Sequence, residues 1–184
     1  QFRCVVSGTC PPSVNSTAGI LTVNALPAIT VQPINSTVCS GSNTTFSVTA
    51  TGAGLTYQWQ LSTDNGVIWN DQADGGVYSD MTTSTMTITG ALTGMDTYQY
   101  RCVVSGTCPP SVTSSAVILT VNDTPSSSVF SSDASICLGN STDLKVDITG
   151  GTSPYVVIYN DGTSNITLNP YISGSNITVN PLTT

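Results

Sequence analysis

Apolar residues alternate with polar residues along most of this chain, in short runs that turn residues separate. In Thr45–Ala50, for example, Phe46, Val48 and Ala50 alternate with threonine and serine. Leu55–Leu61 repeats the pattern and places two aromatic side chains on one face. Strict alternation over a short run is typical of a β-strand with one buried face. The chain is therefore predicted to be all-β.

Turn signals divide the chain into short strands. Asp64–Gly66 predicts a hairpin turn, because asparagine and glycine tolerate the positive φ that such turns need, and Val67–Trp69 is predicted as its returning strand. The remaining alternation predicts further strands, which lie at Ala28–Val31, Ser84–Thr89, Leu144–Ile148, Pro154–Tyr159, Ile166–Leu168 and Ile177–Val179.

One stretch of the chain occurs twice. Gln99–Asn122 repeats Gln1–Asn24 with a spacing of 98 residues, and only four positions differ. Each copy contains a strand, a Gly/Pro turn and a second strand, which predicts a β-hairpin. An isolated hairpin is marginally stable in water, so the first copy needs a sheet to join. We expect its contacts to come from Phe2, Cys4, Val6, Val14, Ile20, Leu21 and Val23.

The repeat predicts three parts. Residues 1–24 are expected to be the final two-strand hairpin of a domain, 25–122 a complete domain, and 123–184 a domain that lacks its last two strands. Thr124–Ser128 is predicted to be a short linker. Ile136–Gly139 repeats the turn pattern of Val38–Gly41.

The N-terminal hairpin lacks a domain, and residues 123–184 lack a closing hairpin, so each part could supply what the other lacks. A sheet without its closing hairpin exposes a strand edge and an apolar face. We expect the hairpin of one copy to complete residues 123–184 of a neighbouring copy, which gives a head-to-tail filament whose partners are copies of this chain. The copies are either separate subunits or segments of one continuous repeat array. The alternative is a fragment with arbitrary boundaries.

Two motifs carry a resemblance. Tyr57-Gln58-Trp59, followed by Asp96-Thr97-Tyr98-Gln99-Tyr100-Arg101-Cys102, resembles the strand C tryptophan and the strand F motif of immunoglobulin domains. The resemblance implies tandem immunoglobulin-like β-sandwiches, one complete and two partial. It also implies a tyrosine corner, in which Tyr100 bonds to the backbone. The sequence departs from the family at Val48, where a cysteine would pair with Cys102.

The whole of residues 25–122, together with the first hairpin, resembles the tandem Ig-like repeats of very large secreted and surface proteins of Bacteroidota-type bacteria. That resemblance implies a bacterial, extracellular or cell-surface location. It carries little information about any particular activity.

The composition narrows the chemistry. The chain has no histidine, three basic residues and a net charge of −7. Nucleic-acid binding and attachment to anionic lipid both need clustered cations, so neither is expected. No stretch is apolar enough to insert in a membrane. No nucleophile has an evident partner base, so we expect no enzyme activity.

The six cysteines indicate disulfides in an oxidising compartment, since a zinc site would need closely paired ligands. Cys39 and Cys137 share one position in the repeat, and Cys10 and Cys108 share another. We favour Cys39–Cys108 within the middle domain, and Cys137 with Cys10 of another copy. The rival pair is Cys102–Cys108, and sequence alone does not determine connectivity. Cys4 and Cys102 are expected to be buried thiols.

Ligand sites have weaker signals. No cofactor is expected, although the Asp-rich stretch from Asp64 to Gly76 has oxygen ligands of the kind that calcium takes. Trp59 is expected in the core, whereas Trp69 is a candidate platform for sugars. Seven Asn-x-Ser/Thr sequons fit either glycan acceptors or simple Asn/Thr richness; they begin at Asn15, Asn35, Asn43, Asn122, Asn140, Asn165 and Asn176.

These observations favour a structural subunit or repeat segment of an extracellular bacterial filament or stalk. The alternative is an adhesin or a carbohydrate-binding module, in which the loops around Asp71–Tyr78 bind glycans. A third alternative is an accessory region of a secreted enzyme.

Overall fold

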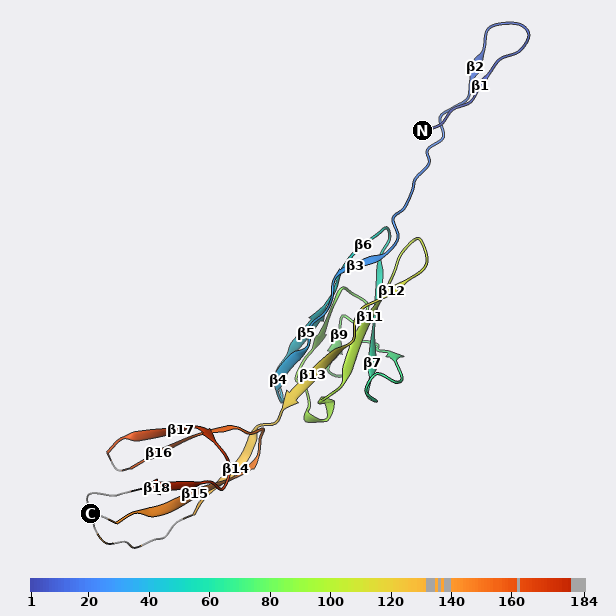
Figure 1. The fold of residues 1–184 in the computed structure, drawn as a ribbon. Coiled ribbons are helices and arrows are strands. Elements are labelled where there is room, and N and C mark those ends of the chain that lie inside the picture. Colours follow the sequence, from blue (N-terminus) through green and yellow to red (C-terminus); the bar gives the residue numbers. More distant parts are fainter. Residues whose placement is uncertain (132–134, 136, 138–139, 162, 180–184) are drawn as a thin grey trace.

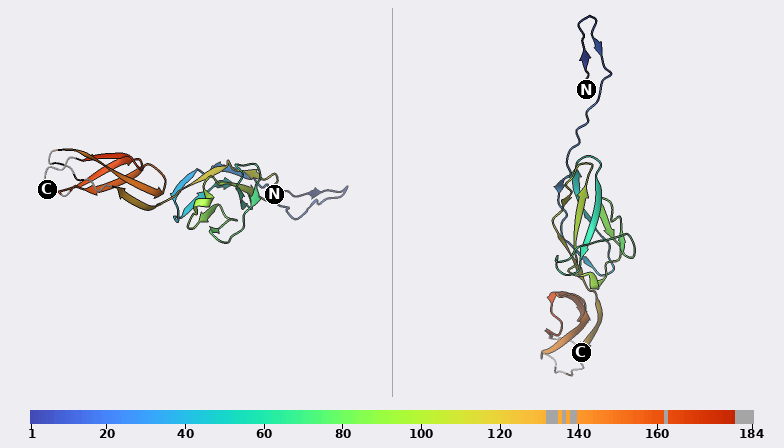
Figure 2. Two further views of the ribbon diagram at one scale, coloured as in Figure 1. Left: turned by 90° about the horizontal axis from the view of Figure 1, so that it is seen from below. Right: turned by 90° about the vertical axis from the view of Figure 1, so that its right-hand side faces the viewer.

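The computed structural model describes residues 1–131, 135, 137, 140–161 and 163–179. The chain forms three parts in a row, which are an N-terminal hairpin, a middle unit and a C-terminal unit (Figure 1). They follow one another end to end, with the N-terminal hairpin and the C-terminal unit on opposite sides of the middle unit (Figure 2). Strands make up all three parts, and the predicted all-β fold is confirmed.

The middle unit is a sandwich of short strands. One sheet has the order β5-β10-β9, the other has β4-β13-β11-β7-β8 with β12 on β11, and β3 pairs with β6. Most neighbours are antiparallel, but β4 and β13 are parallel. The bounds are β3 Ala28–Val31, β4 Ser36–Cys39, β5 Thr44–Ser47, β6 Thr49–Thr51, β7 Thr56–Ser62, β8 Asn70–Asp71, β9 Tyr78–Ser79, β10 Thr85–Ile88, the 3₁₀ turn Thr93–Met95, β11 Gln99–Ser105, β12 Val112–Thr113 and β13 Val117–Asn122.

The predicted alternation places one face of each strand in the core between these sheets. Trp59 is fully buried, as expected, and its indole N–H donates to the Thr83 carbonyl at 3.0 Å. Tyr100 is also fully buried and stacks on Phe46 with ring centroids 5.3 Å apart. The side chain of Tyr100 points into the core, where its hydroxyl forms a hydrogen bond with the Tyr78 hydroxyl at 3.1 Å. The backbone bond that the resemblance implied for Tyr100 is therefore replaced by a bond to a side chain.

The strand predicted at Val67–Trp69 is wrong. Asn65 and Gly66 do have positive φ, but the returning strand is β8, which pairs with Gln60 and Leu61. The Asp64 carboxylate accepts the N–H groups of Val67 and Ile68 at 3.1 and 2.9 Å. These donors are thus held in a side-chain turn and are not available to a strand ladder.

The C-terminal unit has two separate sheets. One has the order β14-β15-β18, and the other is the hairpin β16-β17. The bounds are β14 Pro125–Ser131, β15 Thr142–Gly150, β16 Tyr155–Asn160, β17 Asn165–Tyr171 and β18 Asn176–Val179.

The 98-residue spacing continues into this unit. The pair Val31–Thr49 of the middle unit recurs as Val129–Asp147 in the ladder between β14 and β15. The segment predicted as a linker is therefore largely strand β14, because an edge strand pairs through its backbone and tolerates serine side chains. Of the turn predicted at Ile136–Gly139, the residues Ile136, Leu138 and Gly139 lie outside the described residues, as does Gly162 of the second hairpin turn.

The N-terminal hairpin consists of β1 Val5–Val6 and β2 Val14–Asn15, with a further bridge between Phe2 and Gly19. Residues 1–26 are all exposed. Figure 1 shows that the hairpin points away from the middle unit and joins it through an extended segment. Within the described residues, no helix has the length and apolar character needed to cross a membrane.

Candidate assembly site

Along Tyr155–Tyr159, one edge of strand β16 has no neighbouring strand among the residues that the structure describes. Its counterpart 98 residues earlier, β7, lies inside a sheet and pairs with β11 on one side and β8 on the other. Among the described residues, β16 pairs with β17 alone. Residues 123–179 that the structure describes also contain no counterpart of β11, β12 or β13. In the middle unit, the corresponding edge of β7 is covered by β11.

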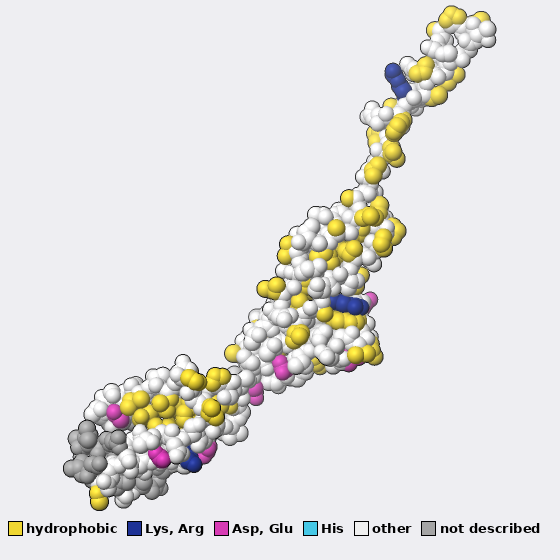
Figure 3. Space-filling view, viewed as in Figure 1, with side chains coloured by type: hydrophobic (Ala, Val, Ile, Leu, Met, Phe, Trp, Pro, Cys, Tyr) yellow, Lys and Arg dark blue, Asp and Glu magenta, His cyan; other side chains and the backbone are white. Residues whose placement is uncertain are grey.

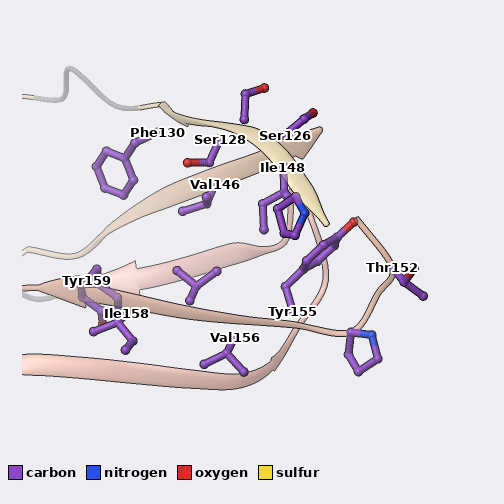
Figure 4. Close-up of a pocket in the computed structure, with 14 residues that line it drawn as sticks. Ser126, Ser128, Phe130, Val146, Ile148, Thr152, Tyr155, Val156, Ile158 and Tyr159 are labelled. Atoms are coloured by element: carbon purple, nitrogen blue, oxygen red, sulfur yellow. The ribbon is translucent and has the colours of Figure 1, made fainter. Parts of the chain in front are cut away.

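A groove runs along this edge. It has a volume of about 640 Å³ and lies between β14 and β15 on one side and β16 on the other. In Figure 4 the side chains of Val146, Ile148 and Tyr155 lie between the strands that border it. Phe130 and Tyr159 also line the groove. Its lining thus combines apolar side chains with the hydroxyl groups of Ser126–Ser128 and Thr152, next to one edge of β16.

The C-terminal unit has a small core. Among its described positions the buried apolar residues are Val146, Tyr171 and Ile177 alone, whereas the corresponding cluster of the middle unit has fourteen members. Large apolar side chains are exposed instead: Val129, Phe130, Val156, Ile158 and Ile172. Figure 3 shows a patch of hydrophobic side chains on the visible face of this unit.

The N-terminal hairpin has the same strand register as its repeat in the middle unit. Val5 pairs with Asn15 and Val6 with Val14, just as Val103 pairs with Thr113 and Val104 with Val112. The bridge Phe2–Gly19 likewise matches the pair Tyr100–Val117.

A side-chain bond recurs as well. The Cys4 N–H donates to Ser16 Oγ at 2.9 Å, and the Cys102 N–H donates to Ser114 Oγ at the same distance. The first hairpin thus adopts the shape that its repeat has inside a sandwich.

The face of this hairpin that would enter a sandwich is exposed. In the repeat, the inward side chains of β11 and β13 are buried: Tyr100, Cys102, Val104, Val117, Leu119 and Val121. The large side chains at the matching positions of the first hairpin are 56–84% exposed: Phe2, Val6, Leu21 and Val23.

Two other predicted contact residues differ from this set. The repeat of Val14 is the half-buried Val112, and the repeat of Ile20 is Ile118, which is 39% exposed. Alternation along the strand gives Ile20 an outward position.

The cysteines form no disulfide in the structure. Cys102 is buried in the same core cluster as Val48, the residue at the position where the resemblance implies a partner cysteine, and burial raises the pKa of its thiol to about 11. Cys39 lies at the end of β4, paired with Asn122, whereas Cys108 lies in the turn at the opposite end of β11. The structure does not bring Cys39 and Cys108 together.

The acidic loop residues already have partners. Asp64 accepts bonds from Ser62, Val67 and Ile68, and these bonds lower the pKa of its carboxyl, with the Ile68 N–H as the largest cause. Asp74 accepts the Met81 N–H at 2.8 Å. Among the described residues, no three acidic or cysteine side chains form a group that could hold a metal ion.

Trp69 also has a partner. The Arg101 guanidinium lies over its ring, 4.3 Å from the centroid, so one face of the candidate sugar platform is covered by this chain's own side chain.

Residues 28–123 match the family described as "Domain of unknown function (DUF8696)", which is more than half of the chain. The chain belongs to this family. No curated protein matches the chain.

Solved structures of immunoglobulin-like tandem domains are similar in fold. An I-band fragment from titin has a TM-score of 0.54 at 22% identity and covers 77% of this chain. A mutated variant of the same titin region has a TM-score of 0.53 at 24% identity, with the same coverage. The structure named Rst D1-D2 has a TM-score of 0.50 at 16% identity, covering 73% of this chain and 68% of its own. The chain spans about half of the titin fragments, 48% of each.

These similarities confirm the predicted fold class, tandem immunoglobulin-like β-sandwiches. The expected bacterial source remains a prediction.

Proposed function

We propose that this chain is a structural subunit or repeat segment of an extracellular bacterial filament or stalk. Copies join head-to-tail when the hairpin Gln1–Asn24 of one copy enters the groove beside β16 of another. Strand addition to a free sheet edge is a known mode of recognition. A contact between two different surfaces does not close on itself, so repeated addition generates a fibre.

One observation carries the proposal. The hairpin has the strand register of β11–β13 and exposes the face that β11–β13 bury, while the C-terminal unit has a free edge where β11 would lie. By the repeat, Phe2, Cys4 and Val6 would face Tyr159, Val157 and Tyr155, as their copies face Leu61, Trp59 and Tyr57.

In the single chain, the hairpin lies in solvent with both of its faces exposed. The support for assembly is the match between the hairpin and the groove.

Truncation tests the proposal. The full chain should form filaments under electron microscopy and sediment as polymers, and the chain without residues 1–24 should remain monomeric. A synthetic Gln1–Asn24 peptide should bind the groove of the truncated chain, and it should also inhibit filament growth of the full chain. Equal assembly of both chains would contradict the proposal.

Two forms of assembly fit the same contacts, which are exchange between separate subunits and a continuous repeat array. Mass spectrometry of the native material distinguishes them. A species of 18.9 kDa indicates exchange, and a far larger polypeptide indicates an array.

The runner-up function is an adhesin or carbohydrate-binding module. In its favour, Val67 and Ile68 are exposed in the loop beside Trp69. Selective binding of the isolated unit 25–122 on a glycan array would favour this function over a purely structural one.

A further inference from the structure

Cys39, which is exposed, and Cys108, which is half-buried, lie at opposite ends of the middle unit. Cys39 ends β4 and pairs with Asn122, the last residue of β13. Cys108 lies beyond the far end of β11, near the start of the unit, where its thiol donates to the Asn24 carbonyl at 3.7 Å. Strand β13 alone separates the two ends by about 17 Å, and a disulfide needs Cα atoms within about 7 Å. The two cysteines are therefore placed to bond outside their own unit.

Asn24 and Asn122 are the same position of the repeat, 98 residues apart, and Asn122 ends β13, the last strand of the middle unit. At Asn122, the carbonyl accepts the N–H of Ser40, the residue after Cys39, at 2.8 Å. At Asn24, the carbonyl accepts the thiol of Cys108, which belongs to the following unit. Each asparagine lies at a junction between two units. The contact from the preceding unit is present at Asn122, and the contact from the following unit is present at Asn24.

If the surroundings of Asn24 are superposed on those of Asn122 by the repeat, the thiols of Cys10 and Cys39 both lie near the Asn122 carbonyl oxygen. Cys10 is the repeat of Cys108, so in a completed C-terminal unit Cys10 would approach the Asn122 carbonyl. Cys39 pairs with Asn122 on the other side of the junction, at the usual spacing of neighbouring strands, about 4.8 Å. Both sulfurs are then within a side-chain length of the same carbonyl.

We propose that Cys39 of one copy forms a disulfide with Cys10 of the copy whose hairpin completes its C-terminal unit. This inference rests on the proposed assembly, because Cys10 reaches the junction only when its hairpin occupies the groove. The repeat pairs Cys137 with Cys108 of the second copy in the same way. The junctions between units then use Cys10, Cys39, Cys108 and Cys137. Cys102 is already buried, and Cys4 becomes buried when its hairpin docks.

The reaction is thiol–disulfide exchange with a low-molecular-weight disulfide as oxidant. The Cys10 and Cys39 thiols lose two protons and two electrons, one sulfur–sulfur bond forms, and the oxidant is reduced to two thiols. The contact between copies becomes covalent.

The test uses the full chain with Cys108→Ser and Cys137→Ser, which leaves Cys10 and Cys39 as its exposed cysteines in the filament. After treatment with oxidised glutathione, non-reducing electrophoresis should show a ladder of oligomers that reductant returns to monomer. Chymotrypsin cleaves between the two cysteines, so mass spectrometry should identify the linked Cys10 and Cys39 peptides.

A mixing experiment provides the matched control. In the same background, Cys10→Ser alone and Cys39→Ser alone should each give monomer bands. An equal mixture should give covalent dimers and nothing larger, since each copy then has one reactive cysteine.

Electron microscopy of the same samples separates the two proposals. Filaments without a ladder, or a Cys10–Cys39 bond within one chain, would overturn the disulfide and leave the proposed assembly standing. Absence of both filaments and ladder would overturn both.

Discussion

At the scale of single residues, the same side chain has two environments in this molecule. Cys102 is buried in the middle unit, and its repeat Cys4 is exposed in the free hairpin. Four-fifths of the surrounding sequence is shared, so the difference comes from the sheet around Cys102 and not from local sequence.

This difference predicts thiol reactivity. Burial raises the pKa of Cys102 from 9.0 to about 11, which lowers its thiolate fraction near neutral pH by about a hundredfold. In the reduced monomer, iodoacetamide should modify Cys4 rapidly and Cys102 slowly, as followed by mass spectrometry. After assembly, Cys4 should become as slow as Cys102. Unfolded chain, in which all six cysteines react, is the control, and continued rapid labelling of Cys4 in filaments would contradict the proposed docking.

Asp161 predicts an acid-dependent contribution to stability. The N–H groups of Ser164 and Thr163 and the Thr163 hydroxyl donate to its carboxylate and lower its pKa from 3.8 to about 2, with the Ser164 bond as the largest cause. A lowered pKa stabilises the folded state above about pH 4, and this contribution is lost as pH falls through 2.

Asp161→Ala should therefore lower the Tm at pH 5, and its difference from wild type should shrink at pH 2. The effect should be small, because the group is exposed. Thermal unfolding followed by circular dichroism measures it, and an equal difference at both pH values would contradict the explanation.

At the scale of elements, neighbouring side chains of β1 point to opposite faces. Only one of these faces should become buried when the hairpin docks. Val6 repeats the fully buried Val104, whereas its neighbour Val5 repeats the half-buried, outward Val103. Both valines are more than half exposed in the free hairpin, so their roles differ only after assembly.

Val6→Asp should weaken assembly by at least about a hundredfold, because it replaces a buried apolar contact with an unpaired carboxylate. Val5→Asp introduces the same charge one residue away and should leave assembly largely intact. Sedimentation velocity of both variants measures the effect. Equal loss of assembly in the two variants would indicate that added charge, and not burial, is responsible.

At the scale of the whole molecule, the chain has few charges with which to hold copies together. Each copy carries a net charge of −7, and the groove is lined mainly by apolar and hydroxyl side chains. Association should therefore depend on apolar burial and strand pairing, opposed by repulsion between like charges.

Raising sodium chloride from about 0.05 M to about 1 M should preserve or strengthen the filaments, because salt screens that repulsion. Light scattering across the series measures it, with urea as the control that should dissolve the filaments in the absence of disulfides. Dissolution by salt alone would show that charge pairs dominate the contact.

Sequence by itself determined much of this protein. Alternation identified the strands around Phe46, Trp59 and Leu144, and the 98-residue repeat identified the hairpin and its exposed apolar face. These features are local, since each depends on residues a few positions apart or on direct identity between two stretches of chain.

Only the tertiary structure decided the rest. Whether Val67–Trp69 extends a strand depends on the carboxylate of Asp64, and the role of the serine-rich β14 depends on backbone pairing with β15. The position of Cys39 relative to Cys108 depends on the parallel pairing of β4 with β13, which places the two at opposite ends of the unit. The repeat shows which cysteines occupy equivalent positions in different units. It does not show how far apart two cysteines lie, because that distance is set by how the strands pair across the sheet.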